Sequence, residues 1–237
     1  MINDFSTTLT NGMQKFNIAL NDTQTEQFQI YCNLLIEWNK KFNLTAITDP
    51  CEIAIKHFVD SCTILRYVDI PKNANMIDVG TGAGFPSIPL KIVRPDIHLT
   101  LLDSLNKRLI FLDEVARQLN MTVETVHGRA EDCGQKTVYR ENFDISVSRA
   151  VAPLNILSEY CLPFVRKGGK FIAMKGKNVQ PEIDNSRKAI KLLGGTYNNI
   201  VEFHIDENNR SIVIVDKTNA TPSVYPRHNS KISKKPL

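Results

Sequence analysis

The sequence has no apolar run long enough to cross a lipid bilayer, which argues against a membrane-spanning helix. It begins Met-Ile-Asn-Asp, with no basic patch followed by an apolar stretch, so we expect no secretory signal. It also contains neither an internal repeat nor a low-complexity block. These absences together predict a globular protein of the cytoplasm.

Cysteines are few and follow no pattern. There are five, an odd number, and no two have the C-x-x-C spacing, which argues against a zinc site or a disulfide framework. We therefore expect reduced thiols that act as small hydrophobic side chains, and no metal site. A cysteine nucleophile is an alternative that no local sequence supports.

Positive charge is concentrated at the C-terminus. Of the 29 basic and 25 acidic residues, five basic and no acidic ones lie in residues 217–237. The remainder of the chain is therefore nearly balanced. Two interpretations fit such a segment, a solvated tail or a tail that contacts phosphates.

One glycine-rich segment carries most of the information. A short apolar run leads to Asp78, glycines follow at Gly80, Gly82 and Gly84, and a helix-compatible segment begins at Pro86. Glycine lets the backbone turn sharply and lets a ligand approach it closely. A strand that feeds a helix through such a turn is where an α/β sheet binds a nucleotide-like ligand. An ordinary strand–turn–helix loop is the alternative.

The spacing of the glycines favours a cofactor without phosphates. A dinucleotide fingerprint reads G-x-G-x-x-G, and here Phe85 stands where its last glycine would fall. A ring there would crowd a pyrophosphate but could pack against S-adenosylmethionine, whose amino-acid end would suit Asp78. Asp103, 19 positions after Gly84, ends a second apolar run, where a carboxylate can accept hydrogen bonds from a ribose. Asp103 could equally cap the helix that follows.

After residue 70 the pattern alternates between strand and helix, which predicts a mostly parallel sheet with helices on both faces. Two strand-like runs then follow with only a short turn between them, so they should form an antiparallel hairpin. The predicted strands are 76–79, 97–102, 123–126, 143–147, 170–174, 195–205 and 210–216. The predicted helices are 87–93, 104–119, 153–164 and 181–193.

The first 70 residues are predicted to be helical. Apolar residues recur at helical spacing over 25–42, and a second helix is expected over about 50–67. We therefore divide the chain into an N-terminal helical extension packed on the core (1–70), a Rossmann-like domain (71–217) and a basic C-terminal tail (218–237).

Several segments together resemble one known family. They are Trp38–Thr45, His57–Ser61, Asp78–Pro86, Gly128–Glu131, Ser148–Ala150, Tyr225–Arg227 and the ending Lys-Lys-Pro-Leu. In this order they are similar to the ribosomal RNA small-subunit methyltransferase G family, also called glucose-inhibited division protein B. The resemblance implies an S-adenosylmethionine-dependent methyltransferase fold, a seven-stranded sheet ending in an antiparallel hairpin. It also implies methylation of N7 of one guanosine in the decoding-region loop (the 530 loop) of 16S rRNA in the small ribosomal subunit.

The resemblance also carries residue roles. Gly80, Phe85, Ala130, Glu131 and Arg149 would bind the cofactor, and Asp103 joins them through the ribose argument. With the rest of the turn, the predicted cofactor-binding set is Asp78, Gly80, Gly82, Gly84, Phe85, Asp103, Ala130, Glu131 and Arg149. Arg149 could instead pair with a carboxylate, and His57 is as readily structural as functional.

The implied chemistry needs no general base, because guanine N7 has a lone pair and no proton. We therefore name no catalytic acid or base and give Arg149 a positioning role. Phe85 and Arg149 are candidates to stack on the target base. Cations expected on the RNA side are Lys107, Arg108, Lys175, Lys177, Arg227, Lys231, Lys234 and Lys235.

Three other functions remain open at this point, and nothing demands a dimer, so we expect a monomer. A dinucleotide-dependent oxidoreductase would bind NAD in place of S-adenosylmethionine. A non-catalytic RNA-binding or ribosome-assembly protein would keep the cofactor and transfer no methyl group. A methyltransferase acting on a protein or a small molecule is the third, and the basic tail is only a modest argument against it.

Overall fold

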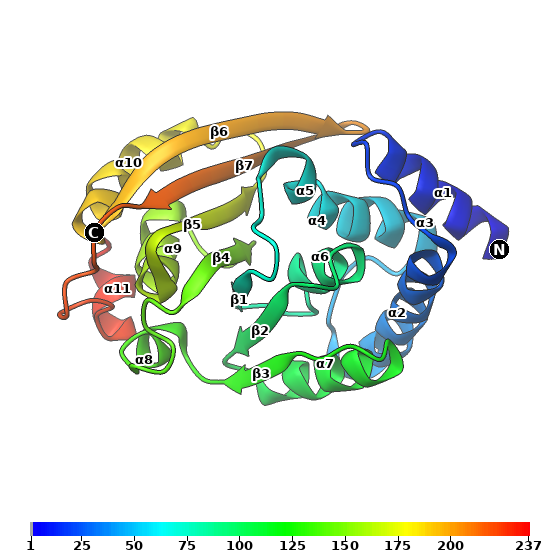
Figure 1. The fold of residues 1–237 in the computed structure, drawn as a ribbon, viewed down its shortest axis with the longest axis horizontal. Coiled ribbons are helices and arrows are strands. Elements are labelled where there is room, and N and C mark those ends of the chain that lie inside the picture. Colours follow the sequence, from blue (N-terminus) through cyan, green and yellow to red (C-terminus); the bar gives the residue numbers. More distant parts are fainter. Residues whose placement is uncertain (1) are drawn as a thin grey trace.

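The computed structural model describes residues 2–237, with side chains from Phe5 onward. A seven-stranded sheet forms the centre, and helices cover both of its faces (Figure 1). The strands are β1 (Asn75–Val79), β2 (His98–Asp103), β3 (Glu124–His127), β4 (Phe143–Arg149), β5 (Val165–Lys175), β6 (Gly195–Ile205) and β7 (Asn208–Lys217).

The strand order is β3-β2-β1-β4-β5-β7-β6. Strands β1 to β5 pair in parallel, whereas β7 is antiparallel to both β5 and β6. Asp78 in β1 lies opposite Leu101 of β2 on one side and Val147 of β4 on the other. The predicted architecture, a mostly parallel sheet that ends in one antiparallel hairpin, is therefore confirmed.

The helices agree with the predicted ones in order, with differences at their ends. They are α1 (Ile2–Gln14), α2 (Asp22–Phe42), α3 (Pro50–Ile53), the π-helix η1 (Ala54–Val59), α4 (Asp60–Cys62), α5 (Ile64–Tyr67), α6 (Ser87–Val93), α7 (Asn106–Gln118), α8 (Ala130–Cys133), α9 (Leu154–Cys161), the 3₁₀-helix η2 (Leu162–Phe164), α10 (Gln180–Leu192) and α11 (Asn229–Lys234). Among residues 2–237, no helix is both long and apolar enough to span a bilayer.

Alternating side chains of the strands enter two separate hydrophobic clusters. In β5, Ile172 and Met174 join the cluster of helices α1 to α7, while Phe171 and Ala173 join that of α9 and α10. Successive side chains of a strand point to opposite faces of the sheet, so a strand covered by helices on both faces buries both sets. The N-terminal helices share their cluster with the sheet, so we infer that residues 1–70 extend the core and do not form a separate domain.

The segment predicted as one helix over 50–67 is interrupted by the π-helix η1. Its widened turns carry His57, and Asp60 follows directly at the start of α4. Single π-helical turns are rare and concentrate at functional sites. Ile53, Phe58 and Val59 are buried across this interruption.

The C-terminal segment is more ordered than a solvated tail. Lys217 is buried, and its ammonium group donates to Leu162 O and Thr221 Oγ1 at 2.7 Å and pairs with Glu141. Arg227 pairs with the buried Glu159 on α9. Figure 1 shows α11 lying beside α8 and α9. The exposed cations of this segment are Lys231, Lys234 and Lys235.

Candidate functional site

A cavity of about 690 Å³ lies at the carboxyl ends of the parallel strands. It opens where β1 stands between β2 and β4, the point at which the strand order reverses direction. Crevices at this point are where open α/β sheets bind their ligands. The turn after β1 forms one wall, and the segments that follow β2, β3 and β4 complete it.

The glycine turn supplies backbone to this wall. Gly82 has a φ of 62°, and its N–H donates to Asp103 Oδ2 at 2.9 Å. Gly84, with a φ of 94°, lies behind the wall, where a Cβ would stand 2.7 Å from Tyr31 Oη and Leu112 Cδ2. Glycine is required at 84 both by the backbone conformation and by this close packing.

The N-terminal helical extension also holds the glycine turn in place. Tyr31 of α2 is fully buried, and its hydroxyl donates to the carbonyl oxygen of Ala83. Its ring stacks on Phe85 at 5.6 Å between centroids, and His57 stacks on Phe85 at 4.6 Å. The predicted cofactor residue Phe85, which lines the cavity, is therefore held in place by rings from the N-terminal helical segments.

Asp78 lies beneath the turn and outside the cavity lining, in contrast to its predicted contact with the cofactor. Its Oδ2 accepts hydrogen bonds from Thr81 at 2.9 Å and Ser87 at 2.5 Å. Its Oδ1 is buried and has no hydrogen-bond partner within residues 2–237. Burial raises the pKa of Asp78 to about 7, although these hydroxyls and Arg149 favour the charged form. Asp78 therefore shapes the turn, as Gly84 does.

This burial predicts a pH-dependent stability. Because the pKa of Asp78 rises from 3.8 to about 7 on folding, the folded state binds the proton more tightly, and stability falls as the pH rises through this window. Asp78→Asn keeps the acceptor for Thr81 and Ser87 but does not titrate. As the pH is raised from 4 to 7, we expect the free energy of unfolding of the variant to increase relative to that of the parent, as measured by urea unfolding. A difference that is constant with pH would contradict this.

Two buried carboxylates, Asp103 and Glu131, also line the cavity. Asp103 accepts from Leu105 N at 2.9 Å and Arg108 at 3.2 Å, in addition to Gly82. Glu131, at the start of α8, is 5% exposed, and its Oε1 has no hydrogen-bond partner in the described part of the chain. A buried acceptor without a partner is costly unless a ligand supplies the donor.

These features fit S-adenosylmethionine. The cavity volume is within the range of small-molecule sites. Glu131 Oε1 offers an acceptor for an adenine amino group or a hydroxyl, Asp103 lines the cavity as a ribose acceptor, and the glycine backbone leaves room for the chain that bears the sulfur. Of the nine predicted cofactor-binding residues, the structure brings seven together along this cavity: Gly80, Gly82, Phe85, Asp103, Ala130, Glu131 and Arg149.

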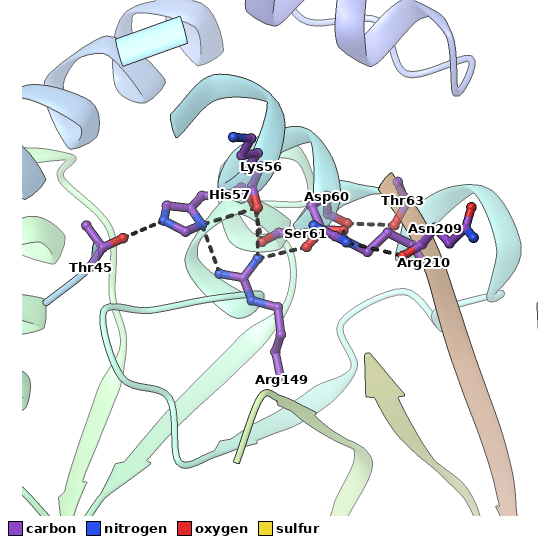
Figure 2. Close-up of polar contacts among 9 residues, drawn as sticks. All are labelled: Thr45, Lys56, His57, Asp60, Ser61, Thr63, Arg149, Asn209 and Arg210. Atoms are coloured by element: carbon purple, nitrogen blue, oxygen red, sulfur yellow. Dashed lines mark hydrogen bonds and ion pairs between the residues drawn. The ribbon is translucent and has the colours of Figure 1, made fainter. Parts of the chain in front are cut away.

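Arg149, at the end of β4, is held by several partners at once (Figure 2). Its guanidinium donates to Asp60 Oδ2 at 2.9 Å and lies 4.8 Å from the centre of the Phe85 ring. Asp60 also accepts from Arg210 of β7 at 3.0 Å through Oδ1. The carboxylate partner expected as an alternative for Arg149 is thus present, and the arginine lines the cavity as well.

His57 belongs to the same network. Its Nε2 lies 2.8 Å from Thr45 Oγ1, and its Nδ1 lies 3.4 Å from an Arg149 nitrogen. Burial, and then the charge of Arg149, lower the pKa of His57 to about 4. The imidazole is therefore neutral at physiological pH, and lines the cavity as an uncharged ring.

The residues predicted to contact RNA fall into two groups. Lys107, Lys177, Lys231, Lys234 and Lys235 are exposed. Each of the others is engaged within the protein: Arg108 with Asp103, Lys175 with Glu182, and Arg227 with Glu159. Arg227 pairs with an acid that is 1% exposed, so it anchors the C-terminal segment, and its contact with a phosphate stays a prediction.

Sequence reasoning missed part of the cavity wall. Tyr160 of α9 lines it, and so do Asn229 and Ser233 of α11, with the Tyr160 hydroxyl 3.0 Å from Asn229 Oδ1. It also assigned no role to Asp60 or Thr45, although both stand in segments that carry the family resemblance. The family resemblance of those segments was the available signal for Asp60 and Thr45. It pointed to these positions but gave them no function.

Fold and cavity together define an S-adenosylmethionine-dependent methyltransferase. The model of one family, rRNA small subunit methyltransferase G, matches residues 24–213. The chain is 49% identical to the Ribosomal RNA small subunit methyltransferase G of Desulforamulus reducens over 239 residues, which cover 100% of both chains. It is 50% identical to that of Acetivibrio thermocellus, covering 97% of this chain and 95% of the relative. The chain belongs to this family, as predicted.

Solved structures share the fold at low sequence identity. TrmN from Thermus thermophilus matches with a TM-score of 0.53 and 15% identity, covering 67% of this chain and 48% of that chain. A geranyl diphosphate methyltransferase solved in complex with SAM matches with a TM-score of 0.51 and 13% identity, covering 67% of this chain and 84% of that chain. The predicted fold class is confirmed.

Proposed function

We propose that the protein transfers a methyl group from S-adenosylmethionine to N7 of a guanosine in the decoding-region loop (the 530 loop) of 16S rRNA, acting as a monomer in the cytoplasm. The observation that carries the proposal is identity of about 50% over nearly the whole chain to curated rRNA small subunit methyltransferases G. The cavity at the carboxyl ends of the strands supports it with residues suited to the cofactor.

The weak basicity of His57 suits an acceptor such as N7, which has no proton to lose. When bound, S-adenosylmethionine offers a methyl group on a positively charged sulfur, and the N7 lone pair takes it while the carbon–sulfur bond breaks and leaves its electron pair on sulfur. No proton has to be removed. His57, whose pKa burial and Arg149 lower to about 4, is a weak base, so this imidazole is poorly suited to take a proton from an acceptor.

Catalysis then depends on orientation. Holding the acceptor nitrogen in line with the methyl group can supply about 7–11 kcal/mol. The chain offers rigid groups for this purpose, because Arg149 is fixed by Asp60 and by the Phe85 ring.

The proposal is tested by methyl transfer in vitro. Small subunits from cells that lack this protein are incubated with the purified chain and S-adenosylmethionine labelled in its methyl group, and the rRNA is digested to nucleosides. We expect label in 7-methylguanosine, confined to one position in the 530 loop of 16S rRNA. Label in another nucleoside, or at another position, would refute the proposal, as would no transfer at all.

The exposed lysines of the C-terminal segment are expected to contact phosphates. Replacing Lys231, Lys234 and Lys235 together by Gln should make the plot of log affinity against log salt shallower by about 0.7 for each single-strand phosphate that is no longer neutralised. Whole-segment deletion is unsuitable, because Lys217 and Arg227 are structural. The control is Lys188→Gln with Lys191→Gln on α10, both exposed. Equal slopes for all three proteins would show that these lysines contact no phosphates.

A further inference from the structure

A second cavity, of about 370 Å³, adjoins the cofactor cavity. Three residues, His57, Arg149 and Ala150, line both. Of these shared residues, His57 and Arg149 belong to the network in Figure 2. A group bound in the second cavity would lie next to whatever the first one holds.

The lining of the second cavity combines apolar and cationic side chains. Ile47 and Met174 are its apolar members, and Lys56, Lys175 and Arg210 join Arg149 as cations. Asp60 is the acid among the lining residues, and it is shared between Arg149 and Arg210. Lys56 and Lys175 also have partners outside the cavity, Glu52 and Glu182. Such a space suits a ligand with a flat apolar ring and an anionic edge.

The plane of the Arg149 guanidinium is fixed between the two cavities. Asp60 holds it at 2.9 Å and the carbonyl of Lys56 at 3.4 Å, while the Phe85 ring lies against it at 4.8 Å. Arg210, itself 3.0 Å from Asp60, keeps that carboxylate in place. Guanidinium planes stack on unpaired nucleobases and pair with phosphates.

We propose that the second cavity receives the target nucleotide, a purine turned out of the RNA strand. Its base lies between the apolar residues Ile47 and Met174 and the Arg149 plane, and its phosphate lies toward Lys56 and Arg210. Enzymes that modify a base commonly extrude it into such a pocket. This inference rests on the proposed function, since it presumes that the acceptor is a base in RNA.

Gly176 offers a way to close this cavity without disturbing the fold. It lines the second cavity, and a Cβ built on it meets no heavy atom within 4 Å. In Gly176→Phe the phenyl ring therefore has free space beside the lining of the second cavity, and it is meant to fill that cavity. The matched control is Asn185→Phe, which places the same ring at an exposed position of α10. Neither position lines the cofactor cavity.

We expect Gly176→Phe to bind S-adenosylmethionine as tightly as the parent in isothermal titration calorimetry, and to lose about 100-fold in kcat/KM for small subunits, because the base cannot reach the methyl group. Asn185→Phe should match the parent in cofactor affinity and in kcat/KM. Wild-type turnover by a folded Gly176→Phe that binds the cofactor normally would overturn the assignment of this cavity. If the parent itself forms no 7-methylguanosine, the proposed function is what fails.

A second measurement needs no variant. RNA of the decoding-region loop with 6-thioguanosine at the target position is irradiated on the wild-type protein, and crosslinked tryptic peptides are identified by mass spectrometry. The inference predicts crosslinks to peptides 42–56 and 171–175, which contain Ile47 and Met174. Crosslinks to other peptides alone would overturn it.

Discussion

Replacing Arg227 with Ala is expected to lower the free energy of unfolding by about 3–5 kcal/mol, the usual cost of removing one partner of a buried ion pair. Glu159, 1% exposed, accepts from Arg227 Nε at 2.9 Å and from its terminal nitrogen at 2.7 Å. Without the guanidinium a buried carboxylate loses its counterion. Urea unfolding followed by circular dichroism measures the change.

The same substitution should weaken binding of S-adenosylmethionine. Asn229 and Ser233, which belong to the helix α11 that follows Arg227, line the cofactor cavity, so loosening this anchor releases part of its wall. Titration calorimetry measures this effect. Lys234→Ala, which removes an exposed cation from the same segment, should change stability by no more than about 0.5 kcal/mol. If Arg227→Ala behaved like Lys234→Ala in both measurements, the anchoring role would be wrong.

Replacing Asp60 with Ala is expected to have a comparable effect on stability and a larger one on turnover. The carboxylate is 5% exposed and joins two arginines, one at the end of β4 and one in β7. Its loss leaves both cations without their partner, at about 3–5 kcal/mol. Because Arg149 would lose its fixed orientation, we expect methyl transfer to fall by about 100-fold.

Two comparisons separate positioning from stability. Asp184→Ala breaks an exposed pair with Arg187 on α10 and should cost no more than about 0.5 kcal/mol, with normal turnover. Asp60→Asn keeps the size of the side chain, so it should recover part of the stability while turnover stays low. Should Asp60→Asn transfer methyl groups at the wild-type rate, Asp60 would have a structural role only.

The sequence predicted those parts of the site that are local in the chain. The glycines after β1 and the acid that ends β2 could be located because a tight turn requires glycine and because carboxyl ends of parallel strands meet at one edge. The antiparallel hairpin followed from a connection too short for a crossover helix. These features depend on neighbouring residues, which is why residue patterns alone revealed them.

Contacts between distant residues were beyond such reasoning. Asp60 and Arg210 are 150 positions apart, and Arg227 lies 68 positions from Glu159. The charges in a sequence do not show which of them are paired, so the pairing of Arg227 with Glu159 was not predicted. Asp78 shows a similar limit, since its distance from the glycines does not reveal that its carboxylate faces Thr81 and Ser87.

The central claim is that the cavity beside β1 binds the adenosyl cofactor. A crystal structure of the protein with S-adenosylhomocysteine tests it most directly. The account predicts the ligand along Gly80 and Gly82, with its adenosine between Asp103 and Glu131 and a hydrogen bond to Glu131 Oε1, the acceptor that now lacks a partner in residues 2–237. A ligand bound elsewhere, or a cavity that stays empty at saturating concentration, would contradict it.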